Sequence, residues 1–141
     1  MPDPFDLQRF VEAQAPLYER VRRELGAGAK ESHWMWFVFP QIAGLGRTPT
    51  SIFYALASLD EARAYLAHPV LGPRLKECVR LVLDGKERTA RQIFGPVDEM
   101  KLRSCLTLFG KAAPDESLFG RCLGKCFDGE PDPATLARLA E

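Results

Sequence analysis

The segment from Lys30 to Gln41 constrains the fold of this chain more than any other. It reads Lys-Glu-Ser-His-Trp-Met-Trp-Phe-Val-Phe-Pro-Gln and holds both tryptophans and two of the nine phenylalanines. Coiled into a helix, it would carry apolar side chains on every side, and such a helix is stable only when protein surrounds it. We therefore expect residues 33–39 to form a helix at the centre of the core.

The rest of the chain also shows helical periodicity. Apolar residues recur three and four positions apart, most clearly over residues 71–82, and no window alternates as a half-buried strand does. Ser58 and Thr89 are typical N-caps, Asp98 is expected to begin another helix, and Asp132-Pro133 to begin the last. The sequence thus predicts an all-α, compact multihelical single domain of seven or eight helices over residues 1–141.

Charge and hydropathy exclude several classes of partner. Nineteen basic residues balance nineteen acidic ones, which argues against broad capture of nucleic acid or of an anionic membrane. The longest uncharged stretch, residues 32–46, is too short to cross a bilayer and contains Pro40. The acidic N-terminus does not resemble a secretory signal. We expect a cytoplasmic protein that binds neither nucleic acid nor membrane.

The cysteines do not form a metal-binding pattern. Cys78, Cys105, Cys122 and Cys126 lack the close CxxC pairs of zinc and redox sites, and no histidine lies near them in the sequence. We expect reduced, buried thiols, no metal site and no cofactor.

Polar residues within the apolar segment make the first candidate cluster. Lys30, His33, Trp36 and Gln41 lie in or beside it. A buried indole N–H needs an acceptor and a buried histidine needs partners for both ring nitrogens, so a polar network is implied. Two interpretations stay open: a core segment with a satisfied histidine, or a pocket lined by His33, Trp36 and Gln41 with Lys30 at its mouth.

The segment that follows holds a glycine pair, Gly44-Leu45-Gly46-Arg47-Thr48. Backbone N–H groups after such glycines can bind an anion, although the spacing matches no phosphate-binding motif. Taken alone, this pattern predicts a turn.

The second candidate cluster is Asp98, Lys101, Arg103 and Ser104 on one predicted helix. An ordinary solvated helix face is the alternative. Because an unpaired buried polar group costs about 1 to 3 kcal/mol, we expect this cluster to meet the first one in space. Asp98 could then orient His33 or accept an indole N–H.

The motif Lys30-x-x-His33-Trp34-Met35-Trp36-x-x-x-Pro40-Gln41-x-x-Gly44-Leu45-Gly46 resembles a bacterial and fungal family of small all-helical proteins, a domain of unknown function. The segment Asp98-x-x-Lys101-Leu102-x-Ser104 resembles the same family. The resemblance implies a helical monomer or homodimer without an established activity. Some relatives are called calpastatin, but a calpain inhibitor requires a long disordered chain, which this sequence does not encode.

Three functions fit these observations. The first is binding of a small anionic, nucleotide-like ligand, with an indole stacked on its ring and cations on its phosphate. The second is hydrolysis of an N-glycosidic bond in a substrate of the NAD or ADP-ribose type, with Asp98 stabilising the transition state. The third is a protein-interaction module without a pocket, using exposed aromatic residues such as Phe53 and Tyr54.

Overall fold

The computed structural model describes residues 3–85 and 89–140, and all regular structure in these residues is helical. Seven of the helices have at least seven residues, so the all-α prediction is confirmed. In chain order the helices are α1 (Gln8–Gln14), α2 (Tyr18–Gly26), α3 (Met35–Val38), α4 (Pro49–Phe53), α5 (Leu59–Ala67), α6 (Leu71–Asp84), α7 (Ala90–Ala112), α8 (Ser117–Phe127) and α9 (Pro133–Leu139).

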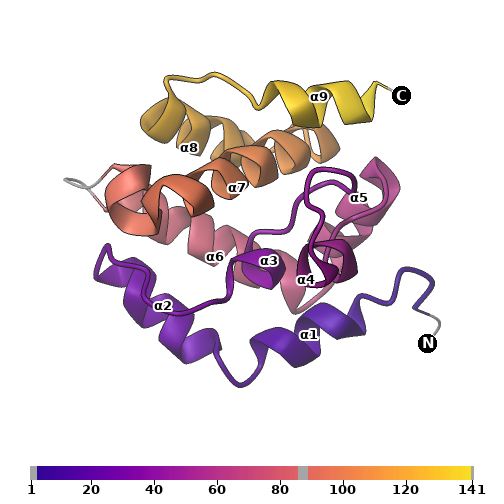
Figure 1. Cartoon of the computed structure of the whole chain (residues 1–141), viewed down its shortest axis with the longest axis horizontal. Coiled ribbons are helices and arrows are strands. Elements are labelled where there is room, and N and C mark those ends of the chain that lie inside the picture. Colours follow the sequence, from indigo (N-terminus) through magenta and orange to yellow (C-terminus); the bar gives the residue numbers. More distant parts are fainter. Residues whose placement is uncertain (1–2, 86–88, 141) are drawn as a thin grey trace.

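The long helix α7 organises the molecule. Helices α8 and α9 lie along one side of it, α1 and α2 lie on the opposite side of the molecule, and α3 lies between them (Figure 1). Helices α5 and α6 pack against each other, α5 also against α7 and α6 against α8. Every layer therefore contributes apolar side chains to one core.

Three of the four caps named above are confirmed, and the one at Asp98 is wrong. The side chains of Ser58, Thr89 and Asp132 each accept a backbone N–H at the start of α5, α7 and α9. Asp98 begins no helix, because α7 bends at Gly95, where φ is 85°, and resumes at Pro96. Proline suits a first helical turn, so the helix resumes two residues before Asp98. The Asp98 carboxylate is then available for other contacts.

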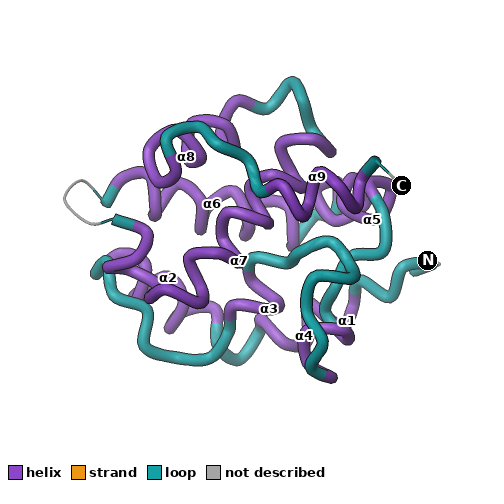
Figure 2. The backbone as a smooth tube through the Cα atoms, turned by 45° about the horizontal axis from the view of Figure 1, so that its top comes forward, coloured by secondary structure: helices purple, strands orange, loops and turns teal. Residues whose placement is uncertain are grey.

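The apolar segment is central, as expected, but only one turn of it is helical. Trp34 and Phe39 are fully buried, while the helix covers Met35–Val38 alone. Pro40 explains the early end, because the residue before a proline is disfavoured in the helical region. Beyond it the chain is extended and forms a parallel bridge between Ile42 and Leu56. Figure 2 shows how much of the chain around α3 and α4 is loop.

The cysteines are free, and all but the half-buried Cys126 are buried. Burial raises the pKa of Cys105, and it raises that of Cys78 to about 12. Within residues 3–85 and 89–140, no group of three His, Cys, Asp or Glu side chains is placed to hold a metal ion. No described helix is long and apolar enough to span a bilayer.

Candidate functional site

A buried carboxylate that the sequence analysis missed holds the loop between α2 and α3. Glu24, only 7% exposed, accepts the backbone N–H groups of Glu31 and Ser32 at 2.8 and 3.0 Å. It also accepts the Ser32 hydroxyl at 2.7 Å and Trp34 Nε1 at 2.9 Å. Burial alone would raise the pKa of Glu24, but these hydrogen bonds lower it to about 2. For Trp34, the predicted acceptance of an indole N–H by Asp98 was therefore wrong.

The sequence did contain a signal for Glu24. It follows Val21 by three residues and precedes Leu25, so it lies on the apolar face of α2, where a carboxylate must find donors. The donors come from a loop seven to ten residues later, which no helical pattern reveals.

The two predicted clusters meet through Lys30, Asp98 and Lys101, which we call the open cluster. Lys30 Nζ lies 2.8 Å from Asp98 Oδ2, and Lys101 Nζ lies 3.0 Å from Asp98 Oδ1. Burial alone would raise the pKa of Asp98, but the hydrogen bonds from both lysines lower it by more. The pKa of Asp98 is therefore below its usual value. Two ammonium groups on one carboxylate leave the open cluster with one net positive charge.

Each lysine of the open cluster also lies over a tryptophan ring. Lys30 Nζ is 5.0 Å from the ring centroid of Trp34, and Lys101 Nζ is 4.9 Å from that of Trp36. Both distances are typical of cation–π contacts. Trp34 is enclosed, whereas Trp36 is half-buried, so only the second pair is open to a ligand.

Trp36 and Lys101 border a cleft of about 290 Å³, which we call the Trp36 cleft. Its remaining wall comes from Gln41, from the loop that enters α4 and from α4 itself: Leu45, Gly46, Arg47, Thr48 and Ser51. A Cβ on Gly46 would lie 2.4 Å from the Ser51 hydroxyl, so this loop packs as it does only with glycine there. None of these described lining residues is acidic. The cleft therefore joins an aromatic wall to cationic groups.

His33 does not take part in a buried network. Its side chain is exposed, and no hydrogen bond joins its ring to another residue of the described chain. Because the helix starts only at Met35, His33 belongs to the loop and faces solvent. The prediction that His33 needs buried partners was wrong.

Arg103 and Ser104 lie away from the cleft, on the side of α7 that faces α9. Arg103 donates to the backbone carbonyls of Glu130 and Pro131 at 2.9 and 3.1 Å. At 100° per residue, Arg103 lies about 140° around the helix from Asp98. Ser104 lies about 9 Å from Asp98 along the helix axis. The structure thus divides the predicted second cluster in two.

Ser104 belongs to a buried group of side chains that we call the closed cluster: Ser104, Thr107, Asp132 and Thr135. The Ser104 and Thr135 hydroxyls are 2.7 Å apart, and the Thr135 hydroxyl donates to Asp132 Oδ2 at 2.6 Å. Thr107 Oγ1 accepts the backbone N–H of Asp132 at 2.8 Å. These bonds attach the start of α9 to α7.

Fold and site together define a small multihelical protein with an open, cationic and aromatic cleft beside its central segment. Over residues 4–139 the chain matches the family described as "Protein of unknown function (DUF1810)", and it belongs to that family. It is 52% identical to a solved structure described as the conserved hypothetical protein Rv1873 from Mycobacterium tuberculosis, which covers 99% of both chains with a TM-score of 0.97. No curated protein matches the chain.

Proposed function

We propose that this protein binds a small anionic ligand that carries a planar ring, and that the Trp36 cleft is the site. The observation that carries the proposal is the meeting of Trp36 and Lys101 in one cleft, with the ammonium 4.9 Å from the ring centroid. An indole offers a flat apolar surface to a ring, and an ammonium attracts an adjoining phosphate or carboxylate.

Charge along the cleft supports an anionic ligand. Arg47 adds a second cation to the wall. It belongs to the loop before α4, whereas Lys101 belongs to α7. Since the whole chain has a formal net charge of zero, the attraction comes from this local arrangement of cations and not from the net charge. A specific small anion fits such a local field better than a polyanion does.

Lys101 is held in position before a ligand arrives. Asp98 fixes its ammonium group, and Lys30, whose side chain is only 7% exposed, fixes Asp98 from the other side. Ordering a free lysine on binding costs about 0.5 to 1.5 kcal/mol, and the open cluster reduces that cost. The same arrangement keeps one positive charge uncompensated at the cleft.

The size of the cleft limits the ligand. Pockets for small molecules usually measure about 300 to 1,000 Å³, and the Trp36 cleft, at about 290 Å³, falls just below this range. One ring with its adjoining anionic group, as in a nucleoside monophosphate, fits this volume.

A titration of the protein with AMP, GMP, CMP and UMP tests the proposal. A ligand present at one hundred times its Kd should stabilise the fold by about 2.7 kcal/mol, visible as a raised Tm. Lys101→Met should remove this shift, whereas Lys111→Met, at an exposed position on the same helix, should keep it. If no monophosphate raises the Tm, or if both variants respond alike, the proposal is wrong.

The hydrolase alternative has no observation in its favour and stays a prediction. It needs Asp98 to face a substrate, but lysine ammonium groups engage both carboxylate oxygens, and Asp98 is outside the described wall of the cleft.

An interaction surface has one specific observation behind it. Ile52 and Phe53 on α4 are 63% and 55% exposed, so two adjacent large apolar side chains face solvent together. The test is self-association or partner binding that Phe53→Ser abolishes without changing ligand binding. Unchanged association in that variant would eliminate this surface.

A further inference from the structure

Resting on the proposed function, we infer that the ligand extends beyond the Trp36 cleft to Arg138 and belongs to the nucleoside diphosphate class. Its ring would lie at Trp36, its first phosphate at Lys101 and its second phosphate at Arg138. The inference depends on three hollows that share walls along the loop from Gln41 to Thr48.

The first link joins the Trp36 cleft to a hollow beside α9. Leu45 lines both of them. The second hollow measures about 720 Å³ and is lined by Gly44, Ala134, Ala137 and Arg138 as well. The two hollows are therefore neighbours on either side of Leu45, and the second has a guanidinium group in its wall.

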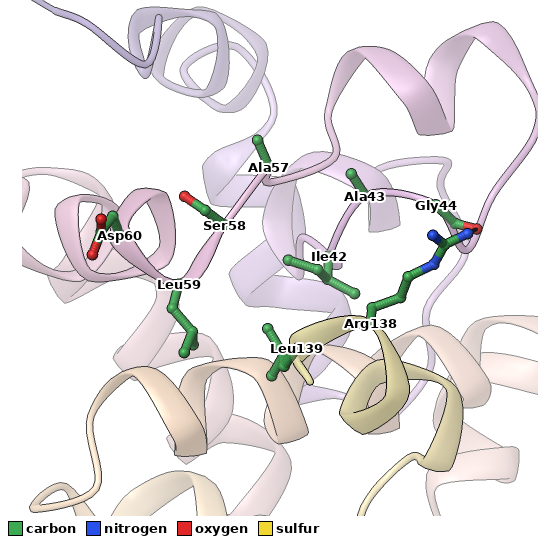
Figure 3. Close-up of a pocket in the computed structure, with 9 residues that line it drawn as sticks. All are labelled: Ile42, Ala43, Gly44, Ala57, Ser58, Leu59, Asp60, Arg138 and Leu139. Atoms are coloured by element: carbon green, nitrogen blue, oxygen red, sulfur yellow. Dashed lines mark hydrogen bonds between the residues drawn. The ribbon is translucent and has the colours of Figure 1, made fainter. Parts of the chain in front are cut away.

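The second link joins this hollow to the one drawn in Figure 3, of about 630 Å³. Gly44 and Arg138 line both. In Figure 3, Arg138 lies beside Gly44 at one end, Asp60 lies at the other, and Leu59 and Leu139 lie between them. The cation is thus at the end nearer the Trp36 cleft, and the acid is at the far end.

Gly44 holds the guanidinium at this junction. Arg138 Nη2 donates to the Gly44 carbonyl oxygen at 3.1 Å, and a Cβ on Gly44 would lie 2.4 Å from Arg138 Cζ. The side chain therefore packs flat on backbone that has no side chain of its own. Gly44 is the chain neighbour of Leu45, which lines the Trp36 cleft, and their Cα atoms are about 3.8 Å apart.

These positions set the charge pattern of the ligand. Lys101 and Arg47 border the first hollow, and Arg138 borders the second. A monophosphate reaches only the first set, whereas a second phosphate continues toward Arg138, whose planar fork suits a phosphate. We therefore expect diphosphates to bind more tightly than monophosphates of the same base.

The experiment compares AMP, GMP, CMP and UMP with the matching diphosphates by isothermal titration calorimetry. The wild-type protein should bind the diphosphate of its preferred base about tenfold or more tightly than the monophosphate. Arg138→Gln should remove most of this preference and leave the monophosphate Kd within about twofold. Arg121→Gln, at an exposed position on α8, is the matched control and should keep the preference.

A second variant protects the test against misfolding. Ala137→Glu keeps Arg138 but adds a carboxylate to the hollow beside α9, at an exposed helical position. It should weaken diphosphate binding alone. If monophosphates bind but diphosphates bind no tighter, or if the variants weaken both equally, the inference is wrong while the proposed function stands. If no monophosphate binds, both are wrong.

Discussion

Two polar clusters lie on different sides of α7, and they differ in how completely their bonding capacity is used. In the closed cluster, Ser104 and Thr135 are at most 1% exposed, and every hydroxyl has a protein partner. In the open cluster, Asp98 and Lys101 keep 18% and 19% of their side-chain surface exposed, and one positive charge is uncompensated.

This difference supports the proposal that the open cluster binds a ligand, while the closed cluster supports the fold. A satisfied, enclosed network has no donor or acceptor to offer a ligand, so it fixes one geometry between α7 and α9. A partly exposed cluster with residual charge, beside an aromatic ring, has interactions still to make. Four substitutions test this division.

The largest effect is expected for Trp34→Ala, beneath the open cluster. Trp34 is fully buried, and replacing a buried tryptophan with alanine lowers the free energy of unfolding by about 3 to 5 kcal/mol. Trp36→Ala is the matched control, because Trp36 is half-buried and should cost much less while abolishing ligand binding. Urea unfolding measures both, and equal losses would contradict the division between core and cleft.

The next effect is expected for Glu24→Gln, which weakens the loop that carries Lys30. Removing the charge from an acceptor of several hydrogen bonds should lower the free energy of unfolding by about 2 to 3 kcal/mol. Glu12→Gln, exposed on α1, should have almost none.

The pH dependence of stability provides a separate check on Glu24. Because the folded pKa is lowered to about 2, its contribution is complete above the unfolded pKa and is lost as pH falls toward 2. Acid unfolding curves should therefore show a stability difference between wild type and Glu24→Gln that shrinks below about pH 4. A difference independent of pH would contradict the role assigned to this carboxylate.

A smaller effect is expected for Asp132→Ala in the closed cluster. Asp132 caps α9 by accepting the backbone N–H of Thr135, and loss of a cap costs about 1 to 2 kcal/mol. Affinity for a monophosphate should not change, since no residue of the closed cluster lines the Trp36 cleft. Asp115→Ala, in an exposed turn, is the control for both measurements.

The smallest effect is expected for Ser104→Ala. Thr135 keeps its bond to Asp132 in this variant, so no buried hydroxyl is left unpaired and the cost should be about 0.5 to 1 kcal/mol. Binding of a monophosphate should again be unchanged. A large loss of affinity would show that Ser104 belongs to the binding site after all.

Local sequence determined most of the architecture. The caps at Ser58, Thr89 and Asp132 depend on side chains within three residues of the N–H groups they accept, so pattern alone predicts them. The burial of Trp34 follows from its apolar neighbours on every side. The approach of Lys30 to Asp98 was expected because both lie beside apolar segments and have complementary charges.

Tertiary structure alone decided which polar residues share a site. Lys101 and Arg103 are two positions apart, yet helix geometry directs one to Trp36 and the other to the loop before α9. Glu24 finds its donors in a loop, and Arg138 reaches Gly44 from ninety-four residues away. Helical periodicity specifies the direction of a side chain relative to its own helix, whereas the packing of α3, α7 and α9 specifies what that side chain meets.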